Sequence, residues 1–440
     1  MSDDYSELPR IIGEMKRAAA DSYMAAQGWF VEVTDDTIYS LWGFLWDSAY
    51  ERPEPDGSGG GDACGWVNFA AESMASTFDN LRGQIDTITG PWTDLPDGSL
   101  CEAPRNAAAL AAGRFGASGA SASVEANAEL AEASSTMNDK LNIVIKGAFT
   151  VPFQDKYSTQ FSLISVGLGI ACAIIELNYD TQQKIWPAAQ DDVVALFVGT
   201  REALREDARQ SAAEFGQVAL TAVAVIGGAA ATIATAGAAV GLVVAAVTVA
   251  GAASIAARGL EAHATITGAD CWDILGSLDT ALGTLNTGIT EIETTLNSRL
   301  QDTITAMESE PAYFNLDAFP ISYPGVTDDV AMTQTDALSI TTKMDRVVTV
   351  LEGAKSTLGS GPSSNPTVRD SFVGISASGT FSYAHELHQL TAQCLNATAA
   401  EYARGEELFK ATVDDFFSTD EAVAAIANSL AADEALTNGA

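Results

Sequence analysis

The side chains best suited to chemistry are few, and the histidines show this first. Only three occur, His263, His385 and His388. His385 and His388 lie three residues apart in the segment H-E-L-H, so both imidazoles could face one metal ion. This spacing differs from H-E-x-x-H, in which an i, i+4 pair of histidines binds zinc from one helix face. We therefore expect a solvated helix start here and no metal site.

The other motifs of catalysis are missing from the sequence. It contains no G-x-x-x-x-G-K-[ST] phosphate loop, no G-x-G-x-x-G after a predicted strand and no G-x-S-x-G nucleophile turn. The acidic pairs Asp191-Asp192 and Asp414-Asp415 are typical of charged helix faces. The sequence therefore predicts a non-enzymatic protein without a cofactor.

Five cysteines are scattered along the chain, at positions 64, 101, 172, 271 and 394. No C-x-x-C pair indicates a zinc or redox site. Cys64 and Cys101 flank a stretch rich in glycine, proline and tryptophan, and outside the cell they could form a disulfide. Unpaired, partly buried thiols are an equal alternative, and the odd total leaves at least one cysteine free.

The charge of the chain excludes one class of partner. Of its 440 residues, 58 are acidic and 22 are basic, which gives a net charge of −36. Such a field repels phosphate backbones and anionic lipid headgroups, so we expect no nucleic-acid partner. The start, MSDDYSELPR, has no basic cluster followed by an apolar run. It predicts either a cytoplasmic protein or export without a cleaved signal peptide.

Helical spacing of apolar residues dominates the chain and indicates which elements would position any site. The predicted helices lie at residues 5–50, 66–89, 104–148, 156–186, 187–214, 270–308, a stretch that includes Ile340 and Leu358, and 381–417. In the helix at 270–308, leucine and isoleucine recur in steps of four and three, which is typical of a seam between helices. Pro187 should lie in a first helical turn, and residues 371–382 are the only modest strand candidate.

These elements predict an all-α fold, an elongated multi-helix bundle with long antiparallel helices and a central apolar helical hairpin. We expect an N-terminal helical region at 1–150, a long-helix bundle at 151–310 and a C-terminal helical hairpin at 330–420. Residues 421–440 form a tail.

Residues 215–257 are the strongest physical feature, because they contain no Asp, Glu, Lys or Arg. Two limbs with a turn near 235–237 would form a helical hairpin, each limb long enough to span a bilayer. Small residues that allow close helix packing accompany it, namely Gly227, Gly228, Gly237, Gly241 and Gly251. Alanine dominates the stretch, so insertion would be only marginally favourable. A buried helix pair and conditional membrane insertion therefore fit equally well.

The last predicted helix carries Tyr402 and Glu406, a Y-x-x-x-[DE] pair on one helix face that a receptor could read together. Small residues precede Tyr402, and apolar residues follow it as far as Phe416. In this pattern the segment resembles the C-terminal end of the EspC family of excreted factors. That family belongs with the small helical-hairpin proteins named for a Trp-x-Gly turn.

The turn of such a hairpin has a counterpart in Phe372-Val373-Gly374, with phenylalanine in place of tryptophan. The resemblance covers about residues 330–420. It implies export by a type VII secretion system without a cleaved leader. The secretion machinery or a small helical-hairpin protein would then be the partner.

Three functions follow as hypotheses. The first is a non-enzymatic type VII substrate, secreted or at the cell surface, whose central hairpin engages a membrane or drives assembly into a homo-oligomer. A hairpin flanked by long helices also resembles, in architecture only, the α-helical pore-forming toxins, which gives the second. The third is a cell-surface scaffolding bundle without lipid contact.

Overall fold

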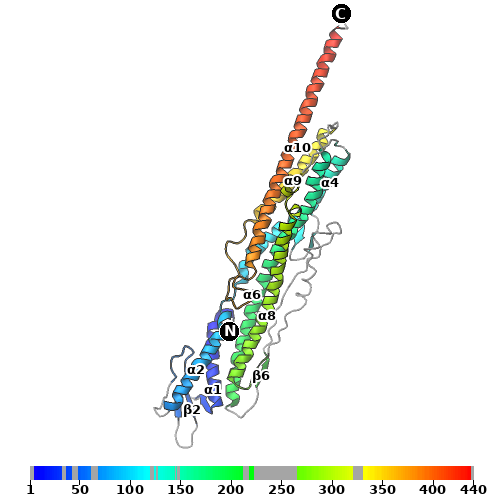
Figure 1. Cartoon of the computed structure of the whole chain (residues 1–440). Helices are drawn as coiled ribbons and strands as arrows, with labels where there is room; N and C mark the ends of the chain where they lie inside the picture. Colours follow the sequence, from blue (N-terminus) through cyan, green and yellow to red (C-terminus); the bar gives the residue numbers. More distant parts are fainter. Residues whose placement is uncertain are drawn as a thin grey trace.

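The chain forms an elongated bundle of long helices, seen here in a computed structural model (Figure 1). The structure describes residues 4–31, 36–41, 48–60, 68–118, 123–124, 127–143, 145, 149–211, 218–221, 265–320 and 331–437. Long helices dominate these residues and the strands among them are short, so the predicted all-α class is confirmed.

The helices, in chain order, are α1 (Leu8–Ala26), α2 (Asn68–Thr89), α3 (Glu102–Gly113), α4 (Ala128–Ile143), α5 (Thr150–Gln154), α6 (Phe161–Ser211), α8 (Cys271–Ser309), α9 (Gln334–Leu358) and α10 (Phe381–Thr437). The strands are β1 (Trp29–Val31), β2 (Ile38–Leu41), β3 (Ser48–Glu51), β4 (Ala117–Ser118), β5 (Ser123–Val124), β6 (Val218–Thr221) and β7 (Thr265–Gly268). Short 3₁₀ turns are η1 (Tyr5–Glu7), η2 (Gly90–Trp92), η3 (Gly98–Cys101), η5 (Pro311–Tyr313) and η6 (Leu316–Ala318), and a π-helical turn, η4 (Asp155–Gln160), joins α5 to α6.

Helices α6 and α8 run antiparallel through the middle of the bundle (Figure 1). Asp270 begins α8 by accepting hydrogen bonds from the backbone N–H groups of Trp272 and Asp273, which satisfies two otherwise unpaired donors. The predicted seam of α8 is buried along its whole length: Leu278, Leu282, Leu285, Ile289, Ile292 and Leu296. Its periodicity therefore identified the face that packs into the core.

Helix α6 continues through Pro187, so the prediction of a first-turn proline was wrong. Proline lacks an N–H and leaves the carbonyl of Gln183, four residues earlier, without its helical donor. The backbone of η3 packs against this point. A Cβ added to Gly98 would lie 2.7 Å from the Gln183 carbonyl and 2.9 Å from Pro187 Cδ. Helix α6 is thus uninterrupted at Pro187, where η3 packs against it.

The continuous helical stretch Thr150–Gln210 is, among the described residues, the one long and apolar enough to cross a membrane. Its most apolar window is 83% buried inside the bundle. Ala171, Ala173 and Trp186 are among its fully buried residues, and they belong to one hydrophobic core shared by α1, α8, α9 and α10. The packing explains the hydropathy of this helix without lipid.

The N-terminal region departs from the helix predicted over residues 5–50. Helix α1 ends at Ala26, and Gly28 then adopts φ +84°. An antiparallel sheet follows in the order β1-β2-β3, with Tyr39 opposite Tyr50. Both tyrosines are buried, and the Tyr39 hydroxyl donates a hydrogen bond of 2.7 Å to Asp21. Aromatic side chains suit such a half-buried pleated surface, and their packing outweighed the helical pattern.

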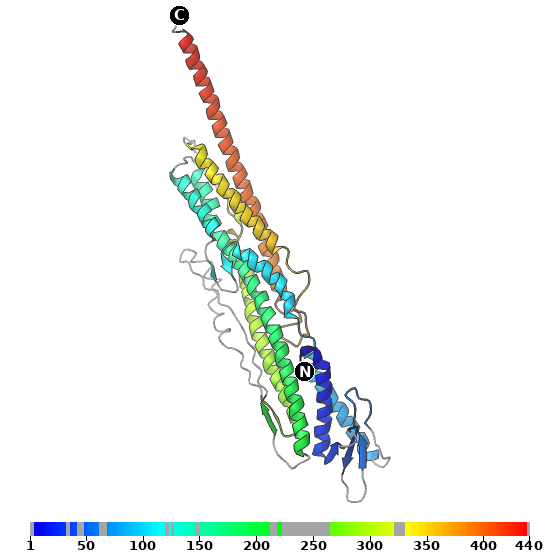
Figure 2. The same cartoon turned by 180° about the vertical axis from the view of Figure 1, so that it is seen from behind.

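Helices α9 and α10 pack together as an antiparallel pair, joined by residues 359–380. Residues 371–380 form turns, so the predicted strand at 371–382 was wrong. Helix α10 extends beyond the other helices at one end of the molecule (Figure 1). Figure 2 shows this protruding part of α10 from behind. At the other end lie the β1–β3 sheet and β6 (Figure 1).

Candidate functional site

Strand β6 lies at the start of the uncharged segment, and strand β7 follows the end of that segment in the chain. They pair antiparallel, with Thr221 opposite Thr265 and Val218 opposite Gly268. Between them lie residues 222–264, which fall outside the described residues, as do the five glycines of the predicted hairpin. Within that predicted helical hairpin, Val218–Thr221 form strand β6, so the helix predicted at 215–257 was wrong for these 4 residues.

The β6–β7 ribbon is attached directly to the start of α8. The backbone N–H of Thr267 donates to Ser277 Oγ at 3.1 Å, and that of Ala269 donates to Asp273 Oδ2 at 3.2 Å. Gly268 has no room for a side chain, because an added Cβ would clash with the backbone of Asp273 and Ile274. The ribbon and the first turn of α8 thus form one packed unit.

Beneath the ribbon, α1, α6 and α8 meet at a buried polar junction. The Ser22 hydroxyl donates a hydrogen bond to Asp207, and Asp270 and Cys271 lie close by. Burial raises the pKa of Asp207; the Ser22 hydrogen bond opposes this shift, and the charge of Asp270 adds to it. Burial also raises the pKa of the Cys271 thiol to about 12. This junction joins α1 and α6 to the start of α8.

Replacing Asp207 by asparagine should stabilise the protein at neutral pH and have less effect in acid. A carboxyl whose folded-state pKa is raised contributes stability that is present at low pH and is lost as the pH rises through that pKa. Asparagine keeps an acceptor for Ser22 and cannot ionise. Thermal melts between about pH 4 and about pH 7 measure the difference. Asp279→Asn on the exposed face of α8 is the control, and an equal pH profile for both variants would contradict the role of Asp207.

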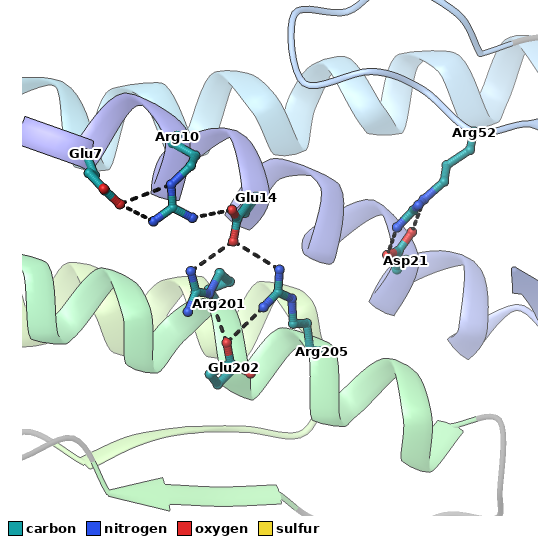
Figure 3. Close-up of polar contacts among 8 residues, drawn as sticks. All are labelled: Glu7, Arg10, Glu14, Asp21, Arg52, Arg201, Glu202 and Arg205. Carbon is teal, nitrogen blue, oxygen red and sulfur yellow. Dashed lines mark hydrogen bonds and ion pairs between the residues drawn. The ribbon is translucent and has the colours of Figure 1, made fainter. Parts of the chain in front are cut away.

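Ion pairs hold α1 against α6 at this end of the bundle (Figure 3). Glu14 on α1 accepts from Arg201 at 2.8 Å and from Arg205 at 3.1 Å, and also from Arg10. Glu202 bridges the same two α6 arginines at 2.9 Å each. Although partial burial acts to raise it, the pKa of Glu14 is held below its usual value by these arginines. Figure 3 also shows Asp21 paired with Arg52 beside β3.

A second buried cluster fastens the α9–α10 loop to the central helices. Arg369 in the loop and Glu293 on α8 form an ion pair whose side chains are both 0% exposed. The Arg369 guanidinium also donates to the carbonyls of Val373 and Thr367, at 2.8 and 3.1 Å, and lies 4.6 Å from the centre of the Trp186 ring. Each of the three guanidinium nitrogens therefore donates a hydrogen bond, which offsets part of the cost of burying the cation.

Glu293 accepts hydrogen bonds from three residues, two in the α9–α10 loop and one on α6. Besides Arg369, it accepts from the backbone N–H of Ile375 at 3.1 Å and from Gln182 of α6 at 3.3 Å. Burial raises the pKa of Glu293, whereas Arg369 favours its charged form. The sequence pattern did not predict this pair. The available indication was Glu293 itself, a charge beside Ile292 and Ile289 on the apolar face of α8.

The predicted turn Phe372-Val373-Gly374 lies on this cluster. Phe372 is 75% exposed, whereas Val373 is fully buried. Gly374 has φ +69°, and its N–H donates to Asn286 Oδ1 at 2.7 Å. Only glycine suits this position. The backbone is left-handed here, and an added Cβ would clash with the Glu293 carboxylate.

Gly374→Ala should lower the free energy of unfolding by about 1–3 kcal/mol, because it combines left-handed backbone strain with a clash. Gly276→Ala is the matched control. Gly276 lies in helix α8 with nothing within 4 Å of an added Cβ, so alanine there should stabilise by about 1 kcal/mol. Urea denaturation measures both, and a neutral Gly374→Ala would show that the turn is not held as described.

Tyr402 and Glu406 lie on one face of α10, but that face packs against the bundle. Tyr402 is 0% exposed, and its hydroxyl donates to the carbonyl of Tyr157 at 3.0 Å. Its ring packs edge-on against Tyr157 and Phe161, with centroids 5.5 and 4.7 Å apart. The Glu406 carboxylate lies 3.5 Å from the Lys410 ammonium, and burial, followed by Asp345, raises its pKa. A receptor can reach Tyr402 only after α10 separates from its neighbours.

The remaining candidate residues are buried, partly buried or outside the described residues. His388 is buried, with Nε2 2.9 Å from the Leu358 carbonyl, so the expected solvated helix start was wrong for this residue. His385 stacks on Phe381. Within the described residues, no group of three or more His, Cys, Asp or Glu side chains could hold a metal ion.

Cys101 is buried and carries a free thiol, whose pKa burial raises to about 12. Its suggested partner, Cys64, lies outside the described residues, so the disulfide stays a prediction. No known protein family, characterised protein or solved structure matches this chain.

Proposed function

We propose that the chain is a non-enzymatic protein that presents its uncharged segment, residues 215–257, to a membrane or to further copies of itself. The observation that carries this proposal is the β6–β7 ribbon, which closes the segment at its base. A segment tied at one point can leave the bundle without unpairing the long helices on either side. The ribbon lies toward one end of an elongated body (Figure 1).

The bundle supports this role because its own core is continuous. Buried residues of α1, α6, α8, α9 and α10 belong to one cluster, and the Ser22–Asp207 contact and the Glu14 ion pairs secure its segment-bearing end. Alanine is the commonest residue of the segment, so transfer to lipid is close to balanced and depends on the surroundings. The net charge of −36 favours a zwitterionic over an anionic membrane.

We also propose export by a type VII pathway to the outside or the surface of the cell. The antiparallel α9–α10 pair with an aromatic-x-Gly turn supports this proposal. The Tyr402–Glu406 pair on α10 would be the export signal. Since Tyr402 is buried, the export machinery, or a small helical-hairpin partner, must bind a state in which α10 is detached near Tyr157.

A pore-forming toxin or toxin component is the second candidate. It is favoured by the long helices α6 and α8, which precede and follow the uncharged segment in the chain and contact the strands of the ribbon. Release of a trapped dye from zwitterionic liposomes tests membrane action. Val243→Asp places a charge in the segment and should abolish release, since a charge at the centre of a span costs about 3 kcal/mol.

Two comparisons make the liposome assay specific. Val368→Asp introduces the same change at an exposed site in the α9–α10 loop and should leave release intact. The pair Ala219→Cys and Thr267→Cys joins opposing residues of the ribbon, and release should persist after oxidation because the segment leaves as a closed loop. If the unmodified protein releases no dye at neutral or acid pH, membrane action is wrong and a cell-surface scaffold takes its place.

A further inference from the structure

A groove separates α10 from the α5–η4 turn, at the opposite end of α6 from the ribbon. Its volume is about 550 Å³, within the range of small-molecule sites, roughly 300–1,000 Å³. Aromatic and aliphatic side chains form its walls: Phe149, Phe153, Tyr157, Leu408 and Phe409. Leu408 is 57% exposed although it borders an apolar surface.

The shape of the groove depends on close packing around it. An added Cβ at Gly405 would clash with the Tyr157 ring, so only glycine lets α10 approach η4 this closely. The ring of Phe153 lies 4.7 Å from Tyr157 and 5.1 Å from Phe409, centroid to centroid. The π-helical turn η4 carries Tyr157, and such turns are frequent at functional sites.

The charged side chains at the groove have a net positive charge, although the protein as a whole is strongly acidic. Lys156, with a side chain only 6% exposed, places its ammonium 2.7 Å from the Glu401 carboxylate. Arg404 lies 3.8 Å from the same carboxylate, and its side chain is 71% exposed. Two cations thus share one anion, which leaves the groove with one positive charge on a chain of net charge −36.

We propose that this groove binds a single-chain anionic amphiphile, a long-chain carboxylate. The carboxylate lies against the exposed Arg404 guanidinium, which suits this anion geometrically. The chain lies between Phe149, Phe153 and Leu408. The limited volume accommodates one chain, and the overall charge repels an anionic membrane surface, so a free amphiphile fits better than a bilayer.

Calorimetric titration of the full chain with dodecanoate, below its micellar concentration, tests this assignment. Dodecanol has the same chain without the charge and should bind on the order of tenfold more weakly, in line with the loss of a charged hydrogen bond. Arg404→Gln should weaken dodecanoate by a similar factor and leave dodecanol unchanged. Arg346→Gln, at an exposed arginine of α9, should change neither.

Thr412→Trp fills the groove from its exposed rim and should abolish binding of both ligands, with the melting temperature unchanged. Equal affinity for dodecanoate and dodecanol would overturn the proposal, as would binding that survives Thr412→Trp. It would also be overturned if dodecanoate failed to bind while an acidic amphipathic peptide bound in the same groove. Dye release from liposomes depends on residues 215–257 and stays intact in Thr412→Trp, so the two proposals fail separately.

Discussion

Replacing Glu293 by alanine is expected to lower the free energy of unfolding by about 3–5 kcal/mol, the effect of leaving a buried partner charge uncompensated. Arg369 would keep its burial and its contact with the Trp186 ring but would lose the carboxylate on which it is centred. The loop N–H of Ile375 would lose its acceptor as well. Urea denaturation followed by circular dichroism measures the change.

Two further variants separate the ion pair from general damage to α8. Glu352→Ala breaks the exposed pair with Lys355, which spans 3.3 Å, and should change stability by no more than about 0.5 kcal/mol. Combining Glu293→Leu with Arg369→Met removes both charges and should recover most of the loss. If Glu293→Ala matched Glu352→Ala, the loop would not be fastened through this pair.

Tyr402→Ala is expected to be nearly as damaging, at about 3–5 kcal/mol, because it empties a fully buried aromatic site beside Tyr157 and Phe161. Tyr402→Phe keeps the packing and leaves the Tyr157 carbonyl without this donor. It should lower the free energy of unfolding by about 1 kcal/mol. Thermal and urea unfolding compare the two variants. A small effect of alanine would show that α10 is not docked here.

Loss of export in Tyr402→Ala would therefore not by itself identify Tyr402 as part of an export signal, because this substitution also lowers the stability of the fold. Glu406→Gln is the sharper variant. Burial and Asp345 already raise the pKa of Glu406, so a neutral side chain should leave stability unchanged or slightly higher. We expect it to abolish export all the same, and Glu407→Gln, its exposed neighbour, to leave export intact. Normal export of Glu406→Gln would show that Glu406 is not part of an export signal.

Local physical chemistry determined most of the secondary structure. The apolar stripe from Leu278 to Leu296 predicted both the helix now seen at Cys271–Ser309 and its buried face. The start of α10 at Phe381 agrees with the predicted helix at 381–417, but the helix continues to Thr437, so its predicted end was wrong and it includes most of the predicted tail at 421–440. These features follow from a 3.6-residue period and from the placement of polar residues, which depend only on neighbours in sequence.

The sequence by itself determined the class of fold, the uncharged segment and the acidic surface, because these depend on composition and on local spacing. The tertiary structure decided what each face meets. It buried Tyr402 on a helix face that could equally have met solvent, carried α6 through Pro187, and paired Arg369 with Glu293 across residues far apart in the chain. It also turned aromatic residues after Ala26 into a sheet. Burial and long-range pairing depend on which elements come together, and no local pattern specifies that.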